Sequence, residues 1–221
     1  IYGNLPSSLK KLCNNKNIPY HEMYKCSTED LQEIVTGVNP DIIVVYSMPC
    51  LLSEKIFSLP RLGTINLHPA YLPEYRGPFP FFWIYYDMKL DPGISVHFIN
   101  KSEDMGDIIY QERCHIEPGT KGSEFVETLI GEYGVKCLLR ALNGLEKGTL
   151  SPIKQPDKSP TRRARRVKND ELHSLIAWQD WPITRVWHFL RGVQSWINPV
   201  FLPNGLRHNS WSIENYIETD M

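Results

Sequence analysis

The sequence lacks the features that would place the chain in a membrane. None of its apolar runs reaches the roughly 18 residues needed to cross a bilayer, and its first residues show no signal-peptide pattern. It also has little net charge, formally -1 at pH 7, so nothing attracts the whole molecule to nucleic acid or anionic lipid. A cytoplasmic protein without a membrane partner is predicted, and a charged ligand would have to be recognised by a local patch.

Several motifs of common enzyme classes are missing as well. The five cysteines are scattered and form no Cys-x-x-Cys pair, which argues against a disulfide framework or a zinc ribbon and fits a reducing compartment. Neither a G-x-G-x-x-G nor a G-x-x-x-x-G-K loop occurs, which disfavours dinucleotide and ATP chemistry. Because the histidines lack tight ligand spacing, no metal site is predicted; the alternative is a set made of His68, His97, His115 and Asp104.

What is present is typical of a folded domain, with 42% hydrophobic and 22% charged residues. Helical patterns at 6–16 and from about 27 to 35 precede an unbroken β-branched run at 42–46. Such a run indicates a strand buried on both faces, as in a parallel sheet. A further strand at 64–68 continues the alternation of helix and strand, which predicts an α/β fold.

The pattern changes after residue 68. Segments 94–99 and 107–111 alternate as two paired strands, and a long amphipathic helix is predicted over 123–145. We divide the chain into a catalytic domain at 1–150, a linker at 151–170 rich in Pro, Lys and Arg, and a small C-terminal subdomain at 171–221. Because the chain starts at Ile1 without methionine, a preceding segment is expected.

Asn66 and His68 form the first candidate site. Residues two apart in a strand project from the same face, and Pro69 ends the strand immediately afterwards. In an open α/β sheet, ligands bind beyond the carboxyl ends of the strands. An amide donor and an imidazole are therefore predicted at the mouth of a pocket. The alternative is a pair at the rim of the core with ordinary hydrogen bonds.

Asp104 lies in a turn that runs into the next strand. A carboxylate there could orient an imidazole and stabilise its protonated form, or it could simply cap the turn. Acyl transfer to an amine needs a donor for the developing oxyanion, a base for the amine proton and a carboxylate to tune that base. Asn66, His68 and Asp104 supply one of each.

Three blocks at 66–77, 93–97 and 104–109 carry a specific resemblance. Their N-x-H…L-P…R-G and D-x-G-x-I-I patterns resemble those of the folate-dependent formyltransferase family. The resemblance implies a Rossmann-like α/β domain with a mostly parallel sheet, whose first strand and helix would lie upstream of Ile1. It also implies 10-formyltetrahydrofolate as co-substrate, with Asn66 as oxyanion donor, His68 as general acid/base and Asp104 as its partner.

The same resemblance assigns residues that contact ligands. In the family, backbone groups of two segments line the pterin slot, and in this chain the matching residues are Pro49, Cys50, Leu52, Asn100, Ser102 and Glu103. Arg76 and Gly77 fall in the loop that faces the amine substrate. Arg76 could also be a solvated loop arginine.

The expected reaction is formyl transfer to the amine of a nucleotide-linked amino sugar, because Trp83 within 80–83 resembles the sugar-modifying branch of the family. The alternatives are methionyl-tRNA formylation, a hydrolytic relative that uses the same three residues, and a non-catalytic folate- or nucleotide-binding fragment. The arginine run at 162–166 could meet phosphate or simply be solvated. The sequence makes no prediction about oligomeric state.

Overall fold

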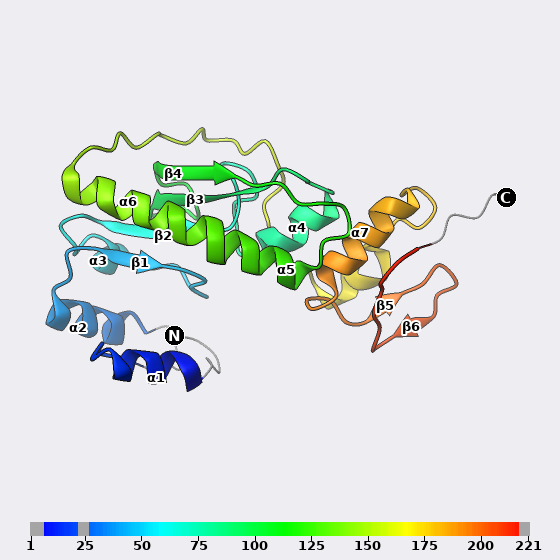
Figure 1. The fold of residues 1–221 in the computed structure, drawn as a ribbon, viewed down its shortest axis with the longest axis horizontal. Helices are drawn as coiled ribbons and strands as arrows, with labels where there is room; N and C mark the ends of the chain where they lie inside the picture. The colour runs from blue at the N-terminus through cyan, green and yellow to red at the C-terminus, as the bar shows by residue number, and fades with distance from the viewer. Residues whose placement is uncertain (1–6, 22–26, 217–221) are drawn as a thin grey trace.

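A computed structural model describes residues 7–21 and 27–216 of the chain, which form helices around one four-stranded sheet and a small two-stranded sheet (Figure 1). In chain order the elements are α1 (Ser7–Asn15), α2 (Thr28–Val38), β1 (Ile43–Val45), α3 (Glu54–Phe57), β2 (Thr64–His68), α4 (Pro80–Tyr86), β3 (Gly93–Phe98), β4 (Ile108–Arg113), α5 (Gly122–Val126), the π-helix η1 (Glu127–Gly134), α6 (Val135–Lys147), the 3-10 helix η2 (Asn169–Ser174), α7 (Ile183–Val193), β5 (Val200–Phe201) and β6 (Arg207–His208). The predicted α/β class is confirmed.

The larger sheet has the strand order β1-β2-β3-β4. β1 pairs with β2 in parallel, whereas β2–β3 and β3–β4 are antiparallel. The described sheet is therefore mixed, which corrects the expectation of a mostly parallel one. The short turn between β3 and β4 enforces antiparallel pairing, because a parallel pair needs a long crossover connection.

The two faces of the sheet have different roles. Continuous helix from α5 through η1 to α6, as predicted for 123–145, crosses one face (Figure 1). A Cβ on Gly134 in this helix would lie 3.0 Å from Ile94 and 3.2 Å from Leu67, so helix and sheet are in close contact there. The apolar side chains of β2 and β3 thus face the helix, and their polar side chains face the opposite side.

Burial of β1 differs from the prediction. The strand lies at the edge of the described sheet, and the side chain of Val44 is 40% exposed. The prediction that 42–46 is buried on both faces is therefore wrong for the described residues. The β-branched run correctly indicated a parallel pairing, but it did not indicate how much of the strand is buried.

The C-terminal part packs on α4 through aromatic side chains. Phe82 lies 5.5 Å from Phe189 between ring centroids, and Tyr86 lies 5.1 Å from Trp181. Gly192 is required at this contact, because a Cβ there would come within 1.9 Å of the Tyr85 ring. The boundaries at 150 and 170 stay a prediction. No described helix is long and apolar enough to span a bilayer.

His188 makes the packing of α7 sensitive to pH. The ring is fully buried against Tyr85, and its Nδ1 accepts the Gly119 N–H at 2.9 Å, while Nε2 has no partner among the described residues. Burial lowers the pKa of His188 to about 4, whereas in an unfolded chain the pKa returns to about 6.5. The folded state thus binds fewer protons than the unfolded chain. The contribution of His188 to the free energy of unfolding is therefore fully present above pH 6.5 and is lost as the pH falls toward 4.

We expect the free energy of unfolding to fall by up to about 3 kcal/mol from this group between pH 7 and pH 4. His188→Gln should show a smaller fall over the same range, measured by denaturant unfolding at several pH values. The exposed His208 provides the control, since His208→Gln should keep the wild-type pH dependence. Equal pH dependence in wild type and His188→Gln would contradict the assignment.

Candidate active site

Asn66 and His68 project from the polar face of β2, as the sequence predicts. In the antiparallel register Asn66 lies opposite His97 of β3, and His68 lies opposite Ser95. Directly opposed residues share a face, so all four side chains lie on the side away from the long helix. The Asn66 amide nitrogen Nδ2 is 3.2 Å from His97 Nε2.

A backbone carbonyl fixes the orientation of the His68 ring. His68 Nε2 lies 3.1 Å from the carbonyl oxygen of Tyr75, which can only accept, so Nε2 carries the proton in the neutral ring. Nδ1 then has the free lone pair, and it lies 3.7 Å from Asp104 Oδ2. A proton arriving at Nδ1 would therefore form an imidazolium next to a carboxylate.

Asp104 is positioned by its backbone and by Gly77. Its φ of 52° is in the left-handed region, which side-chain-bearing residues seldom adopt. Oδ2 accepts the Gly77 N–H at 2.8 Å, and Oδ1 lies 3.5 Å from His97 Nε2. The carboxylate is only 13% exposed, so it lies between two imidazoles at the wall of the site.

The electrostatics give the two groups different protonation states. Burial by itself would raise the pKa of Asp104, but the nearby rings of His68 and His97 and the Gly77 N–H outweigh it and lower the pKa to about 2. Burial lowers the pKa of His68, and the negative charge of Asp104 opposes that effect. At neutral pH the site thus presents a neutral imidazole beside a carboxylate, which suits a general base.

His97 is a site residue that sequence reasoning missed, except as a member of the alternative metal set. Its Nδ1 donates to the Phe98 carbonyl at 2.7 Å, so Nε2 accepts from the Asn66 amide in the neutral ring. This contact fixes which way the Asn66 amide points. The available signal was the alternation that puts Ser95 and His97 on one face of the predicted strand at 94–99, but the pairing of that strand with 64–68 was not predicted. The metal set is not assembled, because His115 is 63% exposed and pairs with Glu117.

The close packing around Gly106 explains why the D-x-G motif has a glycine at this position. The turn brings its Cα against β3, and a Cβ there would lie 1.8 Å from the Phe98 carbonyl oxygen. We expect Gly106→Ala to lower the free energy of unfolding by about 3 kcal/mol, because the turn must shift to relieve the clash. Denaturant unfolding measures this change.

The matched control for that substitution is Gly131→Ala. Gly131 lies in η1, and a Cβ there would meet nothing within 4 Å. This change should stabilise the protein by about 0.5–1 kcal/mol, because alanine has less conformational entropy to lose on folding. If both alanine variants unfolded at the same denaturant concentration, the close approach at Gly106 would be refuted.

Arg76 occupies a different environment from the predicted one. Its side chain is buried, 7% exposed, and its guanidinium donates to the Gln155 side chain and to the carbonyls of Pro156 and Asp157. The alternative of a solvated loop arginine is therefore wrong. Contact with an amine substrate by Arg76 or Gly77 stays a prediction. The geometry supports positioning roles for both, since Gly77 has a φ of 125° and holds Asp104.

The residues predicted to line the pterin slot lie in two segments. One segment follows β1 and the other is the β3–β4 turn: Pro49, Cys50 and Leu52, then Asn100, Ser102 and Glu103. Lys101 in the turn pairs with Glu54 at the start of α3 at 2.9 Å, which brings the two segments together. Cys50 is disulfide-bonded, which the scattered cysteines do not predict. The binding roles of these six residues stay a prediction.

Two further sequence features are explained by internal contacts. Within the arginine run at 162–166, Arg162, Arg163 and Arg165 pair with Asp87, Glu103 and Glu171, respectively. Trp83 is only 4% exposed and donates its indole N–H to the Arg165 carbonyl. The arginine run and Trp83 therefore both attach the segment at 151–170 to the rest of the protein.

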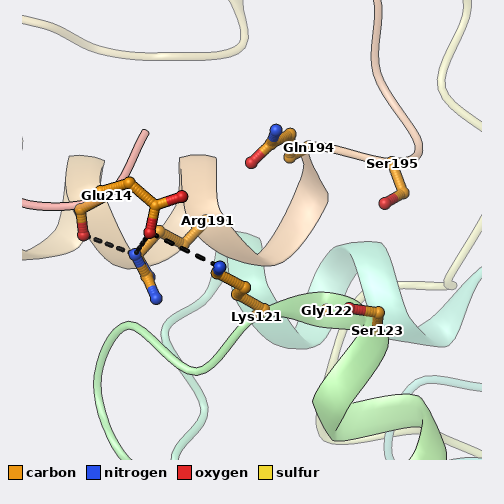
Figure 2. Close-up of a pocket in the computed structure, with 7 residues that line it drawn as sticks. All are labelled: Lys121, Gly122, Ser123, Arg191, Gln194, Ser195 and Glu214. Carbon is orange, nitrogen blue, oxygen red and sulfur yellow. Dashed lines mark hydrogen bonds and ion pairs between the residues drawn. The ribbon is translucent and has the colours of Figure 1, made fainter. Parts of the chain in front are cut away.

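A hollow between the start of α5 and the end of α7 is separate from the candidate site (Figure 2). Lys121 and Arg191 reach into it, and Glu214 pairs with both at 3.5 and 3.1 Å. Its lining contains none of the residues discussed above as candidates. The cluster on β2 and the β3–β4 turn stays the predicted site of the chemistry.

Most of the chain is similar to known proteins. A family model described as formyl transferase matches residues 6–142, which include Asn66, His68 and Asp104. The chain belongs to the formyltransferase family. A methionyl-tRNA formyltransferase of Caldanaerobacter subterraneus subsp. tengcongensis is 30% identical over 210 residues, which are 94% of this chain and 66% of that protein. The chain spans about three fifths of the length of the curated relatives that it matches.

Solved structures of formyltransferases share the fold. A sugar N-formyltransferase from Shewanella sp FDAARGOS_354 has a TM-score of 0.71 and 19% identity, over 97% of this chain and 83% of that one. The formyltransferase PseJ from Anoxybacillus kamchatkensis, in complex with UDP-4,6-dideoxy-4-formamido-L-AltNAc and tetrahydrofolate, has a TM-score of 0.58 and 21% identity, over 87% of this chain and 97% of that one.

Proposed function

We propose that this formyltransferase-family chain transfers a formyl group from 10-formyltetrahydrofolate to the amine of a nucleotide-linked amino sugar. The observation that carries the proposal is the convergence of the Asn66 amide, the His68 imidazole and the Asp104 carboxylate on one small site. These groups come from a strand and from a turn far along the chain. Together they provide an oxyanion donor, a base and a partner that stabilises the protonated base.

Each residue has a defined task in this mechanism. One N–H of the Asn66 amide is taken by His97, and the second has no partner among the described residues, so it can hold the formyl oxygen as negative charge develops. His68 removes a proton from the attacking amine at Nδ1 and returns it to the departing folate nitrogen. The amine adds to the formyl carbon, so the new carbon–nitrogen bond forms first, and the bond to the folate nitrogen breaks as that nitrogen takes the proton from His68. Asp104 stabilises the imidazolium in between.

The choice of co-substrate rests on family membership and on the PseJ structure, which contains tetrahydrofolate. In this chain the segment after β1 and the β3–β4 turn would hold the folate on either side. They are joined by the Lys101–Glu54 ion pair, and the β3–β4 turn carries Asp104.

A small acceptor is favoured over tRNA by the charges near the site. Three arginines of the basic run are already paired with carboxylates within the protein, so their charges are partly neutralised before an RNA backbone could bind. The curated relatives, which are methionyl-tRNA formyltransferases, favour the second candidate, formylation of methionyl-tRNA.

The test is tetrahydrofolate release from 10-formyltetrahydrofolate in the presence of single acceptors. Release that depends on a nucleotide-linked amino sugar supports the first candidate, and release that depends on methionyl-tRNA supports the second. Release without any amine indicates a hydrolase. Folate binding without release under every condition would reject catalysis by this chain and leave a folate-binding fragment.

A further inference from the structure

The segment predicted as a linker is part of the site. After α6 the chain doubles back beside β4 toward α4 (Figure 1), and Ile153 forms an antiparallel bridge with Ile108 at the start of β4. We call residues 153–165 the strap. It is anchored along its length, since Gln155 is 5% exposed and Ala164 is fully buried. A freely moving linker would not bury residues in this way.

The strap hydrogen-bonds the loop at 73–79, which follows the His68 strand, at four backbone positions. The bonds are Ser159 Oγ to Pro73 O at 2.7 Å, Tyr75 N to Thr161 Oγ1 at 2.7 Å, Ala164 N to Arg76 O at 2.7 Å and Phe79 N to Ala164 O at 2.8 Å. The bond to Tyr75 holds the residue whose carbonyl orients the His68 ring. Thr161 holds the Tyr75 backbone, and the Tyr75 carbonyl accepts from His68 Nε2.

Gln155 connects the strap to the other half of the site. Its Oε1 accepts from Arg76 Nε at 3.1 Å and from Arg76 Nη2 at 2.9 Å. Its Nε2 donates to the carbonyls of Asp104 at 3.0 Å and Gly106 at 2.7 Å. Both lone pairs and both N–H groups of the amide are therefore used. The Asp104 backbone, which has a positive φ, is tied to the strap by a neutral bridge that only an amide can supply.

We propose that the strap positions the acid–base pair of the site, and that Gln155 is the positioning residue that sets Asp104 against His68. The two partners come from a strand and a turn, and one strap contacts the segments that orient both, through Thr161 on one side and Gln155 on the other. The gap of 3.7 Å between Asp104 Oδ2 and His68 Nδ1 depends on both contacts. This inference rests on the proposed function for its kinetic consequence but not for its structural one.

The test uses two variants of Gln155 in the full chain. Gln155→Glu keeps the contact with Arg76 but turns an acceptor toward the carbonyls of Asp104 and Gly106, and Gln155→Met removes all four bonds. We expect kcat for tetrahydrofolate release to fall about 10- to 100-fold in both variants, because small displacements of reacting groups cost this much. The KM for 10-formyltetrahydrofolate should change less than threefold. Gln194→Met, which removes a single bond to the Trp211 carbonyl, is the matched control.

A second measurement separates positioning from general stability. The His68 ring is titrated by NMR on protein labelled at histidine nitrogen, which needs no turnover. Burial lowers the pKa of His68 and the charge of Asp104 opposes that effect, so moving the carboxylate away should shift the His68 titration to lower pH in the uncharged variant Gln155→Met and leave it unchanged in Gln194→Met. A merely structural Gln155 would lower the melting temperature without moving the titration of the folded protein.

The outcomes distinguish this proposal from the proposed function. A shifted His68 titration in a protein that never releases tetrahydrofolate would support the strap and reject the function. Unchanged kcat and an unchanged titration in folded Gln155→Met would overturn the proposal. If both Gln155 variants fail to fold, Thr161→Val takes their place. It removes the acceptor of the Tyr75 N–H, together with two longer bonds of 3.2 Å to Ser159 Oγ and the Arg162 carbonyl. A wild-type His68 titration and kcat in that variant would overturn the proposal as well.

Discussion

Replacing His68 with glutamine is expected to lower kcat for formyl transfer by about 10²- to 10⁴-fold, the usual contribution of a general acid–base residue. Glutamine is close in size and keeps an N–H for the Tyr75 carbonyl, so the buried position stays filled. It has no group that can take a proton at neutral pH. The amine must then lose its proton to solvent, from which this 4%-exposed position is largely shielded.

The measurement is steady-state tetrahydrofolate release with saturating folate and the acceptor identified by the panel. The control is His115→Gln, because His115 is exposed and pairs with Glu117 away from the site. Circular dichroism and melting temperature check that the variant is folded. Turnover of folded His68→Gln within a few-fold of wild type would reject His68 as the base.

Replacing Asp104 with asparagine is expected to lower kcat by about 10²- to 10³-fold, because the imidazolium loses the adjacent charge that stabilises it. The amide keeps the size of the carboxylate and still provides an oxygen for the Gly77 N–H. Its N–H₂ group then takes the place of Oδ1, faces His97 Nε2 and competes with the Asn66 amide for that lone pair. Both effects act on the chemical step rather than on folate binding.

The same variant makes a signed prediction about pH. In the wild type, the charge of Asp104 raises the pKa of His68 against the lowering effect of burial. Without the charge the pKa of His68 falls further, so the acid limb of the kcat/KM profile should move to lower pH. Asp107→Asn, an exposed aspartate three residues on, should keep the wild-type profile. An acid limb that stays in place in Asp104→Asn would show that another group controls it.

These two predictions depend on contacts that the sequence could indicate only in part. The motif placed Asn66 and His68 on one face of a strand, and the structure has them there. It also suggested a carboxylate partner, and Asp104 lies within 3.7 Å of His68. Such local patterns are readable because side chains alternate along a strand whatever packs around it.

Other parts of the site were not predicted, because they depend on contacts between residues that lie far apart in the sequence. Gln155 contacts Asp104 across 51 residues of sequence, and Arg76 contacts Gln155 across 79. Arg76 was assigned to solvent or substrate because a charged residue in a loop is normally exposed. Its burial is stabilised by acceptors on the strap, a segment whose Pro-, Lys- and Arg-rich composition is typical of a linker.

The sequence by itself determined the α/β class, helices α1 and α2, the long helix from α5 to α6, the hairpin of β3 and β4 and the family, because these follow from periodicity, turn residues and motifs within short windows. The tertiary structure decided that the sheet is mixed, that β1 is partly exposed and that the strap holds the base and its carboxylate together. Those features depend on which distant groups meet. A buried hydrogen-bonding group finds its partner through the packing of the whole chain, and no local pattern specifies that choice.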